Sequence, residues 1–283
     1  MLPGMEQHFR LEELDVVQKE RIKICVMRVG GTNRDGEAAR CLEDLGVNVE
    51  VLHLNDILRR RNLATYHGLV LPGGFAYGDY VRAGAIWGKR ILSFMKDELR
   101  RFVEAKKPVL GICNGFQVLV EAGLLPGFDF LSEQPQAVLA SNKSSHFECR
   151  WVTLRKNANT NCIFVKSLPE KVRFPVAHGE GRFIPASNEI LDRTINGNQV
   201  VLQYATREGG LAEGGYPANP NGSVMDIAGI CDSNGTVFGL MPHPEDAYWG
   251  YELPDWTVKR KLEPYGDGYF IFKSMVDYIE QSL

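Results

Sequence analysis

Cys113 is the residue of this sequence that is best placed to act as a nucleophile. An apolar run precedes it and a helical spacing follows it, within residues 108–120 (PVLGICNGFQVLV). This pattern predicts a sharp turn from a strand into a helix, with the cysteine at the turn. The amides of the first helical turn favour the thiolate, which is the reactive form of a cysteine.

A histidine and a carboxylate lie two residues apart, far downstream of the cysteine. His243 and Glu245 follow a second apolar run, which predicts a buried strand within residues 235–241. In an extended segment, side chains two residues apart point the same way, so we expect Glu245 to accept a hydrogen bond from the His243 ring. Cysteine, histidine and acid are the nucleophile, base and orienter of acyl transfer. We therefore predict a catalytic triad of Cys113, His243 and Glu245.

Acyl transfer also needs backbone donors that stabilise a negatively charged oxygen. The N–H of Asn114 follows the predicted nucleophile directly, at the start of the helix. A second donor is expected from Gly74 in residues 72–75 (PGGF), at the end of another predicted strand, because glycine permits a close backbone approach.

Two further residues are candidates for contact with a substrate. Gln117 follows Cys113 by one helical turn and falls on the same face, although capping or exposure to solvent fits the spacing equally well. His178 begins residues 178–181 (HGEG), where a titratable ring stands beside flexible backbone. A wall of the substrate site and an ordinary tight turn both remain open for this segment.

Composition excludes several classes of function. The 283 residues contain 32 Lys and Arg against 35 Asp and Glu, a net charge of −3, so no overall positive field exists for binding nucleic acid. No apolar run reaches the length of a membrane span, and the first twenty residues lack a secretory signal core, so we expect a cytoplasmic protein. Six cysteines without a CxxC pair predict neither a metal site nor a disulfide framework.

Strand and helix patterns alternate through the first half of the chain. Strands are predicted at residues 21–30, 47–52, 68–71 and 108–111, with helices at 34–45 and 89–106. This alternation predicts an α/β fold of the flavodoxin-like type, in which helices cover both faces of a largely parallel, twisted sheet. Ligands of such folds bind beyond the carboxyl ends of the strands.

The second half of the chain is richer in strand patterns. The β-rich runs at residues 147–154, 172–177 and 199–204 are expected to extend or flank the main sheet. Residues 208–222 are rich in glycine, proline and asparagine and predict an exposed loop, and residues 267–283 predict a closing amphipathic helix. We expect one domain over residues 21–283, preceded by an extension over residues 1–20.

Several motifs together resemble one known family. Residues 71–84 (LPGGFAYGDYVRAG), 111–117 (GICNGFQ) and 241–245 (MPHPE) are similar to the class I glutamine amidotransferases. Within that class, residues 147–151 (FECRW), 178–181 and 219–230 (NPNGSVMDIAGI) resemble the glutaminase subunits of phosphoribosylformylglycinamidine synthases.

The resemblance implies a reaction and a role for each predicted residue. Cys113 would attack the side-chain amide of glutamine, while Gly74 and Asn114 stabilise the oxyanion. His243 would protonate the departing ammonia and Glu245 would hold the histidine. Gln117 is implied to help bind glutamine.

The resemblance also implies partners. In the family, ammonia passes to a large synthetase subunit that uses ATP to convert formylglycinamide ribonucleotide into formylglycinamidine ribonucleotide, and a small accessory subunit often completes the assembly. The chain shows no ATP motif of its own, and we expect no cofactor.

The same residues leave two rival interpretations. A cysteine peptidase or a γ-glutamyl hydrolase would use a similar nucleophile at a similar turn. A regulatory module with a vestigial site is the non-enzymatic alternative. The presence of Cys113, His243 and Glu245 together argues against this alternative, because a scaffold does not need such a combination of residues.

Overall fold

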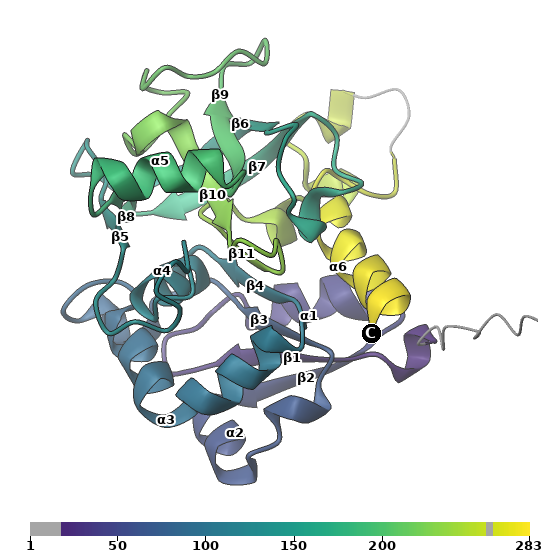
Figure 1. The fold of residues 1–283 in the computed structure, drawn as a ribbon. Helices are drawn as coiled ribbons and strands as arrows, with labels where there is room; N and C mark the ends of the chain where they lie inside the picture. The colour runs from purple at the N-terminus through teal and green to yellow at the C-terminus, as the bar shows by residue number, and fades with distance from the viewer. Residues whose placement is uncertain (1–17, 259–262) are drawn as a thin grey trace, which may run out of the picture.

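A nine-stranded sheet organises the part of the chain that the structure describes (Figure 1). The structure is a computed structural model, and it describes residues 18–258 and 263–283. The expected extension over residues 1–20 therefore lies mostly outside the described residues. Its last residues, together with Arg21, form a short 3-10 helix, Lys19–Arg21.

One half of the sheet is parallel and carries the predicted alternation of strands and helices. Its strands, in spatial order, are β2 (Asn48–His53), β1 (Lys23–Arg28), β3 (Gly68–Leu71), β4 (Val109–Ile112) and β11 (Val237–Leu240). Counted among themselves these strands have the order 2-1-3-4-5, which is that of flavodoxin-like folds. The residues of β3, β4 and β11 are all buried, as expected of strands covered on both faces.

The other half of the sheet is antiparallel. It continues from β11 through β10 (Ile227–Cys231), β9 (Val200–Ala205), β6 (Glu148–Lys156) and β7 (Lys171–His178). A separate two-stranded sheet pairs β5 (Ala137–Ser141) with β8 (Glu180–Pro185). The β-rich runs of the second half thus extend the main sheet, and the predicted α/β class is confirmed.

Helices cover both faces of the parallel half. The helices α1 (Asp35–Asp44) and α6 (Tyr269–Ser282) contact one another on one face. On the other face, α3 (Ala85–Glu104) packs against α4 (Asn114–Glu121). Close packing requires glycine here: a β-carbon at Gly115 would overlap the carbonyl oxygen of Leu71, and one at Gly68 would meet Met275.

Two shorter helices complete the architecture. The helix α2 (Leu54–Arg60) follows β2, and α5 (Asn188–Asn196) packs near β8 (Figure 1). Within the described ranges, no helix combines the length and the apolar character that crossing a bilayer requires.

The exposed loop expected over residues 208–222 is exposed only in its first part. Asn219 and Asn221 are buried at 2% and 0% exposure, so the prediction is wrong for this end of the segment. The side chain of Asn221 donates to the carbonyl oxygen of Gly181 at 2.9 Å and to the hydroxyl of Tyr204 at 3.1 Å. An asparagine in a turn can therefore be buried when groups of another segment form hydrogen bonds with its side-chain amide.

Candidate active site

Cys113 occupies a strained turn between β4 and α4, as the sequence pattern predicts. Its backbone has φ 50° and ψ −104°, an unusual conformation for a residue with a side chain. The turn is held from both sides, because the Cys113 N–H donates to Leu240 O at 2.8 Å and its carbonyl accepts from Gln117 N–H at 3.1 Å. The surrounding sheet and helix thus impose the conformation that presents the sulfur.

The thiol of Cys113 faces a small cavity. The side chain is almost buried, and Sγ lies 3.8 Å from the carbonyl oxygen of Ala177 at the end of β7. The cavity has a volume of about 180 Å³, and the lining residues include Gly74, Gln117 and His178. Four of the predicted residues therefore meet at one cavity beyond the carboxyl ends of β3 and β4.

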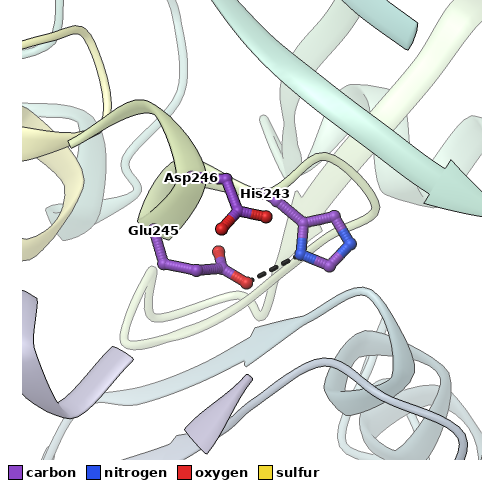
Figure 2. Close-up of side chains that lie close together, drawn as sticks. All are labelled: His243, Glu245 and Asp246. Atoms are coloured by element: carbon purple, nitrogen blue, oxygen red, sulfur yellow. Dashed lines mark hydrogen bonds and ion pairs between the residues drawn. The ribbon is translucent and has the colours of Figure 1, made fainter. Parts of the chain in front are cut away.

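His243 and Glu245 form a buried pair (Figure 2). Nδ1 of the imidazole lies 2.7 Å from Oε1 of Glu245. The expected hydrogen bond between the two side chains is present. The backbone that brings them together differs from the prediction, because Glu245 belongs to the 3-10 turn Pro244–Ala247 and not to an extended segment. His243 itself is extended, and its N–H donates to Pro175 O at 2.8 Å. The tight turn folds the carboxylate back beneath the ring.

The electrostatic surroundings of His243 connect it to Cys113. Burial lowers the pKa of His243, but the negative charges of Glu245 and of the Cys113 sulfur outweigh burial and raise this pKa well above its ordinary value. Nε2 is buried without a hydrogen-bond partner among the described residues. With Nδ1 committed to Glu245, Nε2 is the nitrogen that remains for proton transfer.

Asp246 places a second carboxylate beside the histidine (Figure 2). Burial and the charge of Glu245 raise the pKa of Asp246 to about 6, and Arg34 lies 3.4 Å from its Oδ1. His243, Glu245 and Asp246 each offer an atom within 4.8 Å of the others, as metal ligands do. Nδ1 of His243 and Oε1 of Glu245 already form a hydrogen bond with each other, so we assign no metal to the group.

The loop after β3 brings Gly74 to the cavity. Gly74 has φ +148°, and a β-carbon there would come within 2.7 Å of Gly31 O and 2.8 Å of Asn33 N. Thr32 and Gly74 form an isolated bridge whose hydrogen bonds do not use the Gly74 N–H. The neighbouring Gly73 faces the His243 ring, where a β-carbon would stand 2.8 Å from Cε1. The loop, the cysteine and the histidine thus converge.

Asn114 begins α4, where a backbone N–H has no partner within the helix. Its side chain accepts from Ala76 N–H at 3.1 Å and donates to Gln117 Oε1 at 2.9 Å. Asn114 therefore connects the loop after β3 to the helix that follows Cys113. The roles of Gly74 and Asn114 as oxyanion donors stay predictions.

Gln117 lines the cavity, but its amide is already engaged by the protein. Nε2 donates to Glu180 O at 2.6 Å, while Oε1 accepts the hydrogen bond from Asn114. Gln117 consequently connects α4 to β8. Its proposed contact with a substrate remains a prediction.

His178 ends β7 and is neutral. Asn142 Nδ2 donates to the carbonyls of His178 and His146, so its Oδ1 is an acceptor and His178 Nδ1 carries the proton across their 3.0 Å contact. Burial and the positive charge of His243 lower the pKa of His178 to about 3. Nε2 is then a lone-pair acceptor, and no described residue donates to it.

Two carboxylates of the cavity were not singled out from the sequence. Asp79 and Glu180 both line it, and burial together with the charge of Glu180 raises the pKa of Asp79 to about 6. Glu180 Oε2 accepts the N–H of Ala83 at 3.1 Å. The sequence could have indicated both residues, because Asp79 lies within the motif of residues 71–84 and Glu180 lies within the motif of residues 178–181.

Comparison with known proteins identifies the family. Residues 21–279 match the family described as the CobB/CobQ-like glutamine amidotransferase domain. The phosphoribosylformylglycinamidine synthase subunit PurQ of Archaeoglobus fulgidus is 47% identical, over 94% of this chain and 100% of that protein. The subunit PurQ of Treponema denticola is 44% identical, over 78% of this chain and 86% of that protein.

Solved structures share the fold. A chain in the structure of PurLQS from Thermotoga maritima superposes with a TM-score of 0.66 at 32% identity, and the match covers 91% of this chain and 99% of that chain. A glutamine amidotransferase from Thermotoga maritima superposes with a TM-score of 0.54 at 16% identity over 93% of this chain and 100% of that chain, which shows the fold alone. The chain therefore belongs to the family of PurQ subunits of phosphoribosylformylglycinamidine synthase, which are glutamine amidotransferases.

Proposed function

We propose that this chain is the glutaminase subunit of a phosphoribosylformylglycinamidine synthase and hydrolyses glutamine to glutamate and ammonia. The observation that carries the proposal is the electrostatic interaction of Cys113, on its strained turn, with His243, which is itself paired with Glu245. The family membership supplies the substrate class, and the geometry supplies a nucleophile with a base in electrostatic contact with it.

The first half of the reaction forms a thioester. The Cys113 thiolate attacks the side-chain carboxamide carbon of glutamine, a C–S bond forms, and the carbonyl electron pair moves onto oxygen. The N–H groups of Gly74 and Asn114 stabilise that oxyanion. When the tetrahedral intermediate collapses, the C–N bond breaks and Nε2 of His243 gives its proton to the departing ammonia.

The second half releases glutamate. Water attacks the γ-glutamyl thioester while Nε2 of His243 takes the water proton. The C–S bond then breaks, the thiolate of Cys113 returns and glutamate leaves. Glu245 keeps the imidazole oriented and stabilises its charged form in both halves, because it accepts the hydrogen bond from Nδ1.

The ammonia passes to partner subunits. We propose that a large ATP-using synthetase subunit, with a small accessory subunit, uses this ammonia to convert formylglycinamide ribonucleotide into formylglycinamidine ribonucleotide in purine biosynthesis. The names of the curated relatives and the structural match to a chain of PurLQS support these partners. We place the reaction in the cytoplasm and assign it to one domain over residues 21–283.

The test uses the complex co-purified from the native cell. Cys113→Ala should abolish glutamine-dependent synthesis of the amidine, by at least about 10⁴-fold, because the nucleophile is gone. The same complex should still make the amidine when ammonium is supplied, since the synthetase is intact. Cys149→Ala, which changes an exposed cysteine, is the matched control and should retain glutamine-dependent synthesis.

Two outcomes would oppose the proposal. Full glutamine-dependent activity in the Cys113→Ala complex would remove the nucleophile from the mechanism. Preferential cleavage of short peptides or of folyl-polyglutamate by the wild-type protein would favour one of the rival hydrolases.

A further inference from the structure

Arg34 lies between the loop that carries Gly74 and the turn that follows His243. It directly precedes α1, at the end of the segment that leaves β1. The backbone N–H groups of Asn33 and Arg34 both donate to the carbonyl oxygen of Gly73, each at 3.3 Å. The backbone on either side of Arg34 therefore holds the loop after β3.

These two hydrogen bonds also set the direction of the Gly74 N–H. The Gly73 carbonyl and the Gly74 N–H belong to one peptide group, which is planar and trans, so the two bonds point in opposite directions. Gly74 itself has φ +148°, and glycine resists rotation away from such a conformation very little. The hydrogen bonds from Asn33 and Arg34 thus supply the restraint that the glycine lacks.

The side chain of Arg34 reaches the turn that follows the histidine. Its Nη1 lies 3.4 Å from Oδ1 of Asp246 and 3.5 Å from Oε1 of Glu37. Asp246 belongs to the 3-10 turn Pro244–Ala247, which starts directly after His243 (Figure 2). One guanidinium therefore connects the turn of the histidine to the start of α1.

A direct packing contact closes the same circuit. A β-carbon at Gly73 would stand 2.8 Å from Cε1 of His243 and 3.5 Å from Cγ of Arg34. The glycine, the imidazole and the aliphatic stem of the arginine therefore lie against one another. A shift of the loop would change the position of the ring, and a shift of the histidine turn would change the position of the loop.

We propose that Arg34 is a positioning residue of the glutaminase, which keeps the Gly74 N–H and the imidazole of His243 in one relative geometry through its backbone and its ion pair with Asp246. The inference rests on the proposed glutaminase function. Both groups act on the same tetrahedral intermediate, and a displacement of about 1 Å can lower a reaction rate by about 100-fold. A link between the two segments therefore serves the chemical step.

The test measures release of ammonia from glutamine by the co-purified complex. Arg34→Met removes the guanidinium and keeps an unbranched stem, and Asp246→Asn removes the charge of its partner. Each change should lower kcat by about 3- to 10-fold and leave KM within about twofold, because the groups that act in the transition state are displaced. The assay is run at about pH 8, where Asp246, with a pKa of about 6, is ionised.

A double-mutant cycle separates positioning through Arg34 from a direct effect of Asp246 on the histidine. Asp246→Asn should lower kcat by less than about 1.5-fold in the Arg34→Met background, because the ion pair is already broken. Arg34→Lys keeps a positive charge on a long stem and should restore at least about half of the wild-type kcat. A residue that contributes to folding alone would not give this pattern in kcat.

Arg40→Met is the matched control, because it makes the same change on the same helix. The side chain of Arg40 is 70% exposed and lies 3.8 Å from Oε1 of Glu37. This variant should retain the wild-type kcat. Ammonium-dependent synthesis by each complex shows that the variant has folded and assembled with its partners.

The outcomes separate this inference from the function on which it rests. Failure of the wild-type complex to hydrolyse glutamine would remove the proposed function itself. Hydrolysis by the wild type, with kcat of Arg34→Met and Asp246→Asn equal to that of Arg40→Met, would leave the glutaminase in place and overturn the role of Arg34. Losses that multiply in the double variant would also overturn it, because Asp246 would then act without Arg34.

Discussion

Nδ1 of His243 lies 2.7 Å from Oε1 of Glu245, and the carboxylate belongs to a 3-10 turn that starts directly after the histidine. The pair is buried, so water does not compete for the hydrogen bond. The contact fixes the proton on Nδ1, and in the proposed mechanism it leaves Nε2 free to exchange a proton with the leaving group and with water.

Glu245→Gln should reduce kcat for glutamine hydrolysis by about 10³- to 10⁴-fold. The new amide can donate to Nδ1, which places the imidazole proton on Nε2 and removes the lone pair needed there. The loss of negative charge should also lower the pKa of His243, contrary to its present upward shift. The pH dependence of kcat/KM checks both effects, and a variant within threefold of the wild type would exclude Glu245 as orienter.

Gly74→Ala should reduce kcat by about 10²- to 10³-fold, the usual loss when one oxyanion donor is displaced. A β-carbon at this position would come within 2.7 Å of the Gly31 carbonyl oxygen, so the loop must move and carry the N–H with it. Gly36→Ala is the control, because a β-carbon there meets nothing within 4 Å. Glutamate production and thermal unfolding of both variants provide the measurement, and equal kcat values would argue against Gly74 as donor.

The neutral state of His178 should make stability depend on pH. Its pKa is about 3 in the folded protein against 6.5 ordinarily, so between these values the unfolded chain binds a proton there and the folded chain does not. The free energy of unfolding should therefore fall as pH is lowered from 6.5, by about 1.4 kcal/mol per pH unit from this group.

Urea unfolding between neutral and mildly acidic pH measures this dependence. His178→Gln should show a flatter pH dependence than the wild type, whereas His146→Gln, at an exposed histidine, should retain the wild-type slope. Parallel curves for wild type and His178→Gln would mean that His178 binds a proton in the folded state.

The parallel half of the fold could be predicted from the sequence because each of its signals is local. Apolar runs that end in glycine or proline mark β3 and β4, and the helical spacing after Cys113 marks α4. The contact between His243 and Glu245 was also predicted, since two residues of separation restrict the geometry. The backbone at Glu245 forms a tight turn and not the extended segment that we expected, yet the hydrogen bond between the two side chains is present in either case.

The other parts of the site depend on features that a sequence pattern does not contain. Asp79 reaches the cavity because Tyr77, Gly78 and Asp79 all have positive φ values. Two of these residues are not glycine, so the amino-acid composition of the loop does not predict this backbone conformation. Asn142 fixes the proton of His178 from a segment 36 residues away. Asn221 is buried because a distant carbonyl accepts from it, although its neighbours in sequence have the composition of an exposed loop.

The cavity beside Cys113 has a volume of about 180 Å³, a size that suits a small metabolite better than a folded polypeptide. Size alone should then make a glutamine side chain on the surface of a folded protein a poor competitor for this sulfur. A reactive thiolate can be kept in the cell at little risk to other proteins when the space in front of it favours small molecules.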